Sequence, residues 1–215
     1  MKILSRKITR IFIACILIIL GAISYSNANI KINNQEEKYL NEYNKAIKNM
    51  EDNMLNVTKT GNIDLDYLYE MIVHHQGAID MSNNLLKYGG QNHDVKKIAE
   101  KIIFSQTASI ERMNMMIDTL NKNPIKDTCK ESEYLKEYEA ALSEMMKGFA
   151  SLKPTGNIDK DFLEEMIVHH QGAMNMVKAI QKYSDNNEIK AMAEKESNSQ
   201  MPEIEKMKEI AESIK

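Results

Sequence analysis

The sequence predicts an all-α protein: a helical bundle built from two pseudo-symmetric repeats of three helices each. The 215 residues include only three prolines and eight glycines, and residues with high helix propensity are abundant. No segment alternates between apolar and polar residues as a half-buried strand would. The third observation is an internal duplication, because residues 61–78 and 156–173 are identical at 15 of 18 positions. Together these features indicate two copies of one helical unit.

The first 28 residues are predicted to be an export signal that is cleaved after Ala28. A basic start without acidic residues is followed by a 13-residue apolar run at 11–23 and then by a small-x-Ala pattern. A helix of that length spans about 20 Å, which is too short for the ~30 Å hydrocarbon core of a membrane. We therefore expect an extracytoplasmic protein that is periplasmic, cell-wall-associated or secreted, with no membrane contact beyond this signal.

Charge and cysteine content narrow the classes of partner. Without residues 1–28 the chain has 24 basic and 31 acidic residues, a net charge of −7, which argues against nucleic acid. One cysteine would then remain, Cys129, so an internal disulfide is excluded. The expected partner is a metal ion, and the sequence leaves open a homo-oligomer or a metal-handling partner protein.

The predicted organisation is a first helical repeat at residues 29–120, a linker at 121–131 that contains Pro124, and a second helical repeat at 132–215. Residues of the two repeats correspond along most of their length. Tyrosines and methionines of the first helix recur 95 residues later, and the offset shortens by one residue after a loop. This period is too long for a solenoid and indicates a tandem duplication.

The first two helices of each repeat follow from residue spacing and capping signals. The first is predicted at residues 36–57 and 132–152, where tyrosine, leucine and methionine recur at helical spacing. The second is predicted to start at an aspartate N-cap and to end at a tyrosine that glycines or a polar turn follow. Its limits are Asp64 and Tyr88 in the first repeat, and Asp159 and Tyr183 in the second.

The third helix of each repeat is predicted from a largely apolar stripe with spacings of three and four. Pro202 falls inside the second of these helices and is expected to kink it or start it afresh. His93 and the charged run at 194–196 are expected to be solvated. We expect the four longer helices to form the centre of the bundle. The stripes consist of Ile103, Gln106, Ile110, Met113, Ile117 and Leu120, and of Gln200, Ile204, Met207, Ala211 and Ile214.

Four of the five histidines lie as adjacent pairs in the duplicated block, at His74-His75 and His169-His170. At about 100° per residue, the imidazoles of each pair flank the line of the helix that faces the core, and Met71 or Met166 lies on that line. Neutral imidazole suits copper, zinc, iron and nickel, while thioether is a soft ligand that favours Cu(I). The sequence has 16 methionines, and several share helices with the histidines.

These observations predict an exported copper-binding protein that buffers or sequesters Cu(I) through histidine and methionine side chains. An enzyme is not expected, because the sequence contains no metalloprotease, hydrolase or phosphate-binding motif. The predicted metal ligands are His74, His75, His169 and His170, then Met71, Met81, Met166 and Met176, and finally Met113 and Met207.

Two other interpretations stay open. In the first, the protein is a metal-free helical interaction module whose histidines form a structural polar layer with Gln106 and Gln200. In the second, it holds iron or zinc in a carboxylate–histidine site, as ferritin-like di-iron proteins do with Glu-x-x-His. Glu70 and His74 are four residues apart rather than three, yet they share one side of the helix.

The duplicated block resembles the signature of the family known as domain of unknown function 305. That signature reads Met-Ile-x-His-His-x-x-Ala-x-x-Met, followed by Ser-Gln-x-x-Glu-Ile-x-x-Met. Both repeats match its first part, and the second repeat matches the rest, including Glu203. The first repeat has Ser109 where glutamate is expected, which puts a carboxylate role there in doubt. The resemblance implies a ferritin-like helical bundle, usually exported, with some members tied to copper binding and tolerance.

Overall fold

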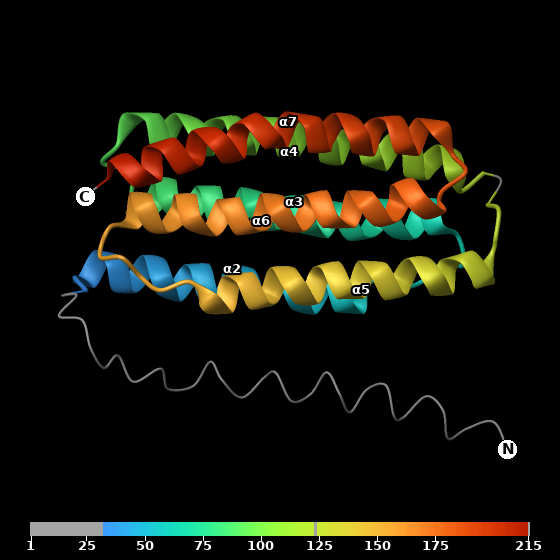
Figure 1. Cartoon of the computed structure of the whole chain (residues 1–215), viewed down its shortest axis with the longest axis horizontal. Coiled ribbons are helices and arrows are strands. Elements are labelled where there is room, and N and C mark those ends of the chain that lie inside the picture. Colours follow the sequence, from blue (N-terminus) through green and yellow to red (C-terminus); the bar gives the residue numbers. More distant parts are fainter. Residues whose placement is uncertain (1–31, 123, 215) are drawn as a thin grey trace, which may run out of the picture. The chain divides into compact units, whose positions relative to one another are not determined.

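The structure is a computed structural model that describes residues 32–122 and 124–214 (Figure 1). The predicted export signal at residues 1–28 and its cleavage after Ala28 lie outside this range. Residues Ile32–Lys215 belong to one compact unit, which contains the second predicted repeat and the first from residue 32 onward. Among the helices of the described ranges, none combines the length and the apolar character needed to cross a membrane.

The described residues form six α-helices and no strand, so the predicted all-α class is confirmed. The helices are α2 (Asn34–Asn56), α3 (Ile63–Tyr88), α4 (His93–Leu120), α5 (Thr128–Ser151), α6 (Ile158–Tyr183) and α7 (Asn187–Ser213). The order and lengths of α2–α4 match those of α5–α7, as the duplication in the sequence predicts.

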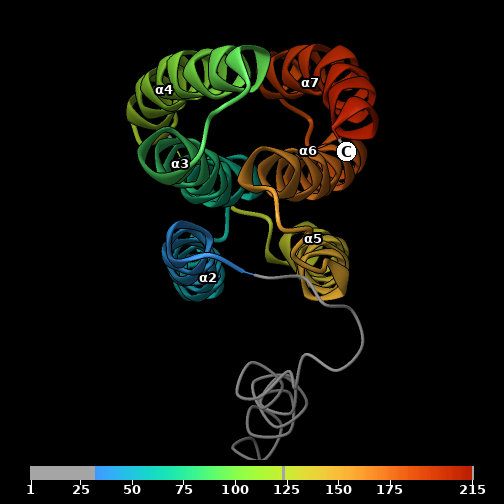
Figure 2. The same ribbon diagram turned by 90° about the vertical axis from the view of Figure 1, so that its left-hand side faces the viewer.

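The helices form three layers of two (Figure 2). The middle layer consists of α3 and α6, which pack against each other; α4 and α7 cover one side of it, and α2 and α5 the other. The prediction that four long helices form the centre is therefore wrong, because α4 and α7 belong to an outer layer. The physical reason is the width of the buried surface: α3 buries 15 residues around its circumference, and α4 buries seven.

The middle helices start at asparagine caps rather than at the predicted aspartates. The side chain of Asn62 accepts hydrogen bonds from the backbone N–H groups of Asp64 and Leu65, and Asn157 caps α6 in the same way. Asparagine and aspartate are about equally favourable at the N-cap position, so residue type alone does not show which of the two residues caps the helix. Because Asp159 does not cap α6, its carboxylate can accept hydrogen bonds from the backbone N–H groups of residues 90–92, which immediately precede α4.

Three further differences concern helix limits and faces. Helix α5 begins at Thr128 after its Asp127 cap, so residues 128–131 of the predicted linker are helical. Helix α7 runs unbroken through Pro202, whose side chain is exposed, so the helix does not start afresh there. The buried stripe of α4 is rotated slightly from the predicted one and includes Ile102 and Ser109. His93, at the start of α4, is exposed as expected.

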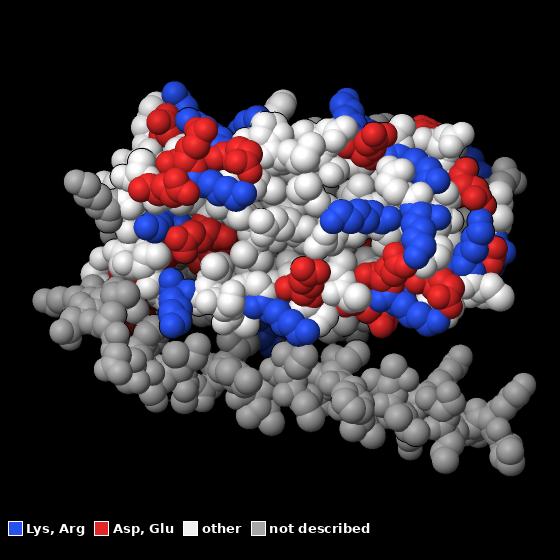
Figure 3. All heavy atoms as spheres, in the orientation of Figure 1, with Lys and Arg blue, Asp and Glu red and all other residues white. Residues whose placement is uncertain are grey.

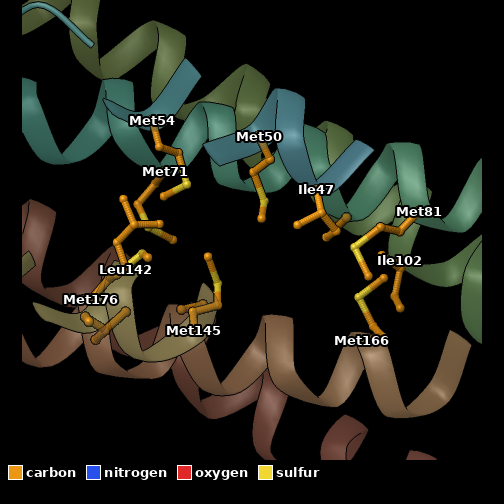
Figure 4. Close-up of a cluster of buried hydrophobic side chains, with 14 of the residues drawn as sticks. Ile47, Met50, Met54, Met71, Met81, Ile102, Leu142, Met145, Met166 and Met176 are labelled. Atoms are coloured by element: carbon orange, nitrogen blue, oxygen red, sulfur yellow. The ribbon is translucent and has the colours of Figure 1, made fainter. Parts of the chain in front are cut away.

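Methionine fills much of the core between the layers (Figure 4). Met50 of α2 packs its sulfur directly over Gly77 of α3, and Met145 of α5 packs over Gly172 of α6. A Cβ atom at either glycine would meet the sulfur and the Cγ atom of the methionine. The glycines of the duplicated block therefore allow the outer helices α2 and α5 to approach the middle layer closely.

On the face seen in Figure 3, the outer surface carries both positive and negative side chains, and neither sign forms a large region of its own. Lysine and arginine side chains alternate there with aspartate and glutamate side chains. Several of these charges pair within a helix, for example Lys48 with Asp52 at 2.8 Å. Such exposed pairs contribute little to stability, so the packing of the layers dominates it.

We predict that Gly77→Ala and Gly172→Ala destabilise the protein, although alanine favours helix over glycine by about 1 kcal/mol. The added methyl group overpacks the contact with Met50 or Met145, which costs about 1–3 kcal/mol. The Gly172 variant should lose more, because the Cβ and Cγ atoms of Met145 lie closer to that methyl group than those of Met50. Urea unfolding measures the change, and a gain in stability would show that the methionines move aside freely.

Candidate functional site

The four paired histidines are buried in the middle layer, with at most 1% of each residue exposed. The rings of His74 on α3 and His169 on α6 meet across the interface of the two helices, with centroids 3.8 Å apart. The rings of His75 and His170 lie about 6 Å from these, at 6.2 and 6.0 Å. The prediction that the histidines turn into the bundle interior is confirmed. We call these four rings the histidine layer.

The central pair carries one hydrogen bond. The Nε2 atom of His169 lies 3.0 Å from the backbone carbonyl oxygen of His74. Because a carbonyl oxygen only accepts, Nε2 of His169 carries the hydrogen and Nδ1 carries the lone pair. No described group bonds to Nδ1 of His169 or to either ring nitrogen of His74. The centre of the histidine layer therefore offers imidazole lone pairs that no group within residues 32–122 and 124–214 uses.

His170 is oriented by a carboxylate of α7. Its Nε2 atom lies 3.1 Å from Oε2 of Glu203, and Lys101 of α4 lies 3.0 Å from the other oxygen of that carboxylate. Burial alone would raise the pKa of Glu203, but the hydrogen bonds from His170 and Lys101 outweigh it and hold the pKa below its ordinary value. An ionised carboxylate fixes the hydrogen of His170 on Nε2 and leaves the lone pair of Nδ1 available to a ligand.

His75 has a carboxylate neighbour that sequence reasoning missed. Oε2 of Glu196, on α7, lies 3.6 Å from Nε2 of His75, and Oε1 of Glu196 accepts a hydrogen bond from the Ser109 hydroxyl of α4. Burial opposes ionisation of Glu196, but His75 and Ser109 lower its pKa below the ordinary value. Ser109 occupies the position that corresponds to Glu203. Glu196 thus brings a carboxylate to His75 from the other repeat.

The expectation that the charged run at 194–196 is solvated is therefore wrong for Glu196, whose side chain is only 11% exposed. The sequence contained one usable signal, which is the short hydroxyl of Ser109 at a buried position where the family pattern expects glutamate. That hydroxyl leaves room for a second side chain. A local pattern cannot reveal that the second side chain comes from α7.

The two glutamines that the metal-free interpretation pairs with the histidines are also buried, Gln106 on α4 and Gln200 on α7. Neither forms a hydrogen bond with a histidine in the described part of the chain, and their side-chain oxygens have no partner there. A buried polar atom without a partner costs about 1–3 kcal/mol. Among the described residues, buried atoms of this kind include Nδ1 and Nε2 of His74, Nδ1 of His75, His169 and His170, and Oε1 of Gln106 and Gln200, and others occur elsewhere in the core, for example at Tyr43 and Asp161.

The predicted thioether ligands are all buried: Met71, Met81, Met166, Met176, Met113 and Met207. Met71 precedes His74 by three residues, and Met166 precedes His169 by three, so each lies about one helical turn from its histidine on the same side. Met81 and Met176 follow by seven residues, about 10 Å along the helix.

Figure 4 shows how these thioethers gather around the middle layer. Met81 and Met166 point toward each other, and Met71 and Met176 gather at the other end of the same cluster. Because Met71 precedes and Met81 follows His74 along α3, thioethers flank the histidine layer on both sides. Met113 of α4 and Met207 of α7 come from the outer layer.

The glutamates of the duplicated block point away from the histidine layer, toward α2 and α5. Glu70 accepts a hydrogen bond of 2.7 Å from the Tyr134 hydroxyl and pairs with Lys59, and Glu165 accepts a hydrogen bond from Tyr39. A carboxylate–histidine site formed by Glu70 and His74 is therefore not supported. In residues 32–122 and 124–214, no three His, Cys, Asp or Glu side chains come together to hold a metal ion.

Burial sets the protonation of the central histidines. Removal from water, together with the neighbouring imidazoles, lowers the pKa of His74 and of His169 well below 6.5. Both rings are therefore neutral at neutral pH, which is the form that binds metal ions. Neutral imidazole nitrogens thus lie together at the α3–α6 interface, buried thioethers lie on the same two helices, and no carboxylate of the described residues bonds to the central pair. This donor set suits a soft, low-charge cation.

Comparison with known proteins places these features in a family. The model of the family described as "Domain of unknown function (DUF305)" matches residues 64–211, which include both histidine pairs. A crystal structure of a DUF305 fragment from Deinococcus radiodurans is similar, with 23% sequence identity and a TM-score of 0.52. The match covers 71% of this chain and 97% of the fragment, and at this identity it shows the fold alone. No curated protein matches the chain.

We predict that Glu70 makes stability fall as the pH rises. Burial raises its pKa from 4.5 to about 7, despite the opposing charge of Lys59. Folding therefore takes up a proton at Glu70, and the stability this contributes is full below pH 4.5 and lost as the pH passes about 7. The effect is at most roughly 3 kcal/mol. Urea unfolding between pH 4.5 and 8 should show a smaller decline for Glu70→Gln, and equal declines would contradict the assignment.

A second prediction concerns the hydrogen of His170. Glu203→Ala removes the acceptor of its Nε2–H group, so the ring should change from one tautomer to a mixture of both. Nitrogen-15 NMR of the imidazole distinguishes the two forms. Glu205→Ala is the matched control, because Glu205 is exposed on the same helix and pairs with Lys208. A mixture already present in the unaltered protein would show that Glu203 does not orient the ring.

Proposed function

Because this chain belongs to the DUF305 family, whose domain has no assigned function, we propose from the site itself that the protein binds Cu(I) through histidine and methionine side chains. It would buffer or sequester the ion rather than convert a substrate. The proposal is supported above all by one observation: buried Nδ1 lone pairs of the histidine layer have no partner among the described groups.

The central ligands would be the imidazoles of His74 and His169, which already lie in contact and are neutral. Met71 and Met166 would supply the nearest thioethers, one turn away on the same helices. His75 and His170 would add donors through Nδ1, because their Nε2 atoms face carboxylates. The four thioethers further from the central pair complete the proposed set: Met81, Met176, Met113 and Met207.

The identity of the metal follows from the donors. Thioether is a weak ligand for zinc and iron, which prefer histidine with thiolate or carboxylate ligands, and it selects Cu(I). Glu70 and Glu165 are engaged by tyrosines and do not reach the central pair. A monovalent ion also places less charge in the buried layer, so it needs no carboxylate to neutralise it. These points support Cu(I) over a ferritin-like iron or zinc site.

Storage is favoured over catalysis by how deeply the histidine layer is enclosed. The rings are covered on one side by α4 and α7 and on the other by α2 and α5. Two surface pockets, of about 520 and 250 Å³, are lined by residues other than the four histidines. An ion held there would exchange slowly. We also propose an extracytoplasmic location, which rests on the export signal expected at residues 1–28.

A second candidate function is a metal-free helical module in which the histidine layer is structural. It is favoured by the hydrogen bond between His169 and the His74 carbonyl and by the contact of His170 with Glu203. It does not account for the partnerless nitrogens of His74, because a structural histidine normally bonds through at least one ring nitrogen.

Titration of the purified protein with Cu(I) against a competing chelator tests the proposal. Met71→Leu combined with Met166→Leu should weaken binding about tenfold or more, since these changes remove the nearest soft donors while keeping the volume of the core. Met50→Leu combined with Met145→Leu is the matched control, because these methionines pack against glycines of the middle helices.

His74→Gln combined with His169→Gln should abolish tight binding at the histidine layer. The melting temperature of each variant without metal shows whether it still folds. Tight binding that none of these changes weakens would refute the proposal. Absence of tight binding in the unaltered protein would instead favour the metal-free module.

A further inference from the structure

A pocket of about 520 Å³ lies between the C-terminal part of α4 and the N-terminal part of α7, and no histidine lines it. Three methionines do: Met115 and Met116 from α4, and Met192 from α7. We propose that this pocket is a second site for a soft monovalent cation, Cu(I) or Ag(I), held by thioether sulfur alone. The pocket is separate from the histidine layer and does not depend on it.

The exposure of the three methionines differs in a way that suits a site open to solvent. Met115 is 63% exposed, Met116 is half-buried, and Met192 is only 6% exposed. The thioethers therefore extend from the mouth of the pocket to its floor. Most methionines of the described chain are buried in the core, so an open position such as that of Met115 contributes little to packing.

A second pocket, of about 250 Å³, provides an internal comparison. It lies at the other end of the α4–α7 groove, and its Ile98, Lys101 and Lys206 correspond in the repeat to Met192, Lys195 and Arg112 of the first pocket. The positions that correspond to Met115 and Met116 are Glu209 and Ile210. Sulfur thus lines one pocket and is absent from the residues that line the other. The packing of α4 against α7 does not require it.

The charges around the methionine pocket restrict what it can bind. Arg112 and Lys195 line it, with Glu188 as the single carboxylate. Hard divalent cations such as Ca²⁺ and Mg²⁺ need several oxygen ligands and would be repelled by the two basic side chains. A monovalent ion is repelled by these groups about half as strongly as a divalent one, and polarisable sulfur, which carries no charge, can supply its binding energy. These charges therefore favour a soft monovalent ion over a hard divalent one.

Titration with Ag(I), which shares the softness of Cu(I) and is stable in air, tests this inference. In protein labelled with carbon-13 at the methionine methyl groups, the NMR signals of Met115, Met116 and Met192 should shift together and saturate at one bound ion. Met201 is the internal control, because it is 47% exposed on α7 and does not line the pocket. Its signal should stay in place over the same range.

A variant that combines Met115→Leu, Met116→Leu and Met192→Leu should bind one Ag(I) fewer than the unaltered protein, as counted by native mass spectrometry. The single variant Met115→Leu, at the most exposed position, should weaken binding at the pocket without affecting folding. The inference is overturned if the three signals do not shift, if Met201 shifts in parallel with them, or if the single variant binds as the unaltered protein does.

These outcomes are independent of the histidine layer. The variant His74→Gln with His169→Gln should leave the shifts of Met115, Met116 and Met192 unchanged. In the unaltered protein, binding at the pocket without binding in the interior would contradict only the proposed function. The reverse pattern would contradict only the second site.

Discussion

The contact between the His74 and His169 rings at the α3–α6 interface is the constraint around which the remaining structure is arranged. Two imidazoles with centroids 3.8 Å apart cannot both carry charge in a dry interior, so burial keeps them neutral. The small residues Ala78 and Ala173 stand one turn beyond His74 and His169 and leave space for the rings. The middle layer is thus built to hold uncharged nitrogen donors away from water.

Side chains of the outer layers form hydrogen bonds with buried polar groups, and several of these bonds link one repeat to the other. Tyr39 of the first repeat bonds to Glu165 of the second, and Tyr134 of the second bonds to Glu70 of the first. Glu196 of the second repeat bonds to Ser109 of the first. Because each repeat leaves buried acceptors that the other satisfies, neither repeat would be fully paired alone. These hydrogen bonds therefore add to the packing of α3 against α6 in joining the two repeats.

The parts that the sequence predicted well are those fixed by local spacing. The end points Tyr88 and Tyr183 and the inward direction of the histidines follow from the 3.6-residue period within one helix. The asparagine caps, the helical start of α5 and the burial of Glu196 were missed, because each depends on contacts outside the local pattern. Which helices form the middle layer was also missed, because it depends on how much of each helix's circumference is buried by neighbouring helices.

The two halves of the site are similar but chemically unequal, and the inequality lies in α4 and α7. His170 faces Glu203, which Lys101 also engages, whereas His75 faces Glu196, which the Ser109 hydroxyl engages. The contact of His170 with Glu203 is 3.1 Å, within hydrogen-bond distance, whereas that of His75 with Glu196 is 3.6 Å, longer than a hydrogen bond. A carboxylate therefore orients the His170 ring more tightly than the His75 ring, although both belong to the same duplicated block. Duplication set the positions of the four rings, and divergence of the outer helices gave the two outer rings different neighbours.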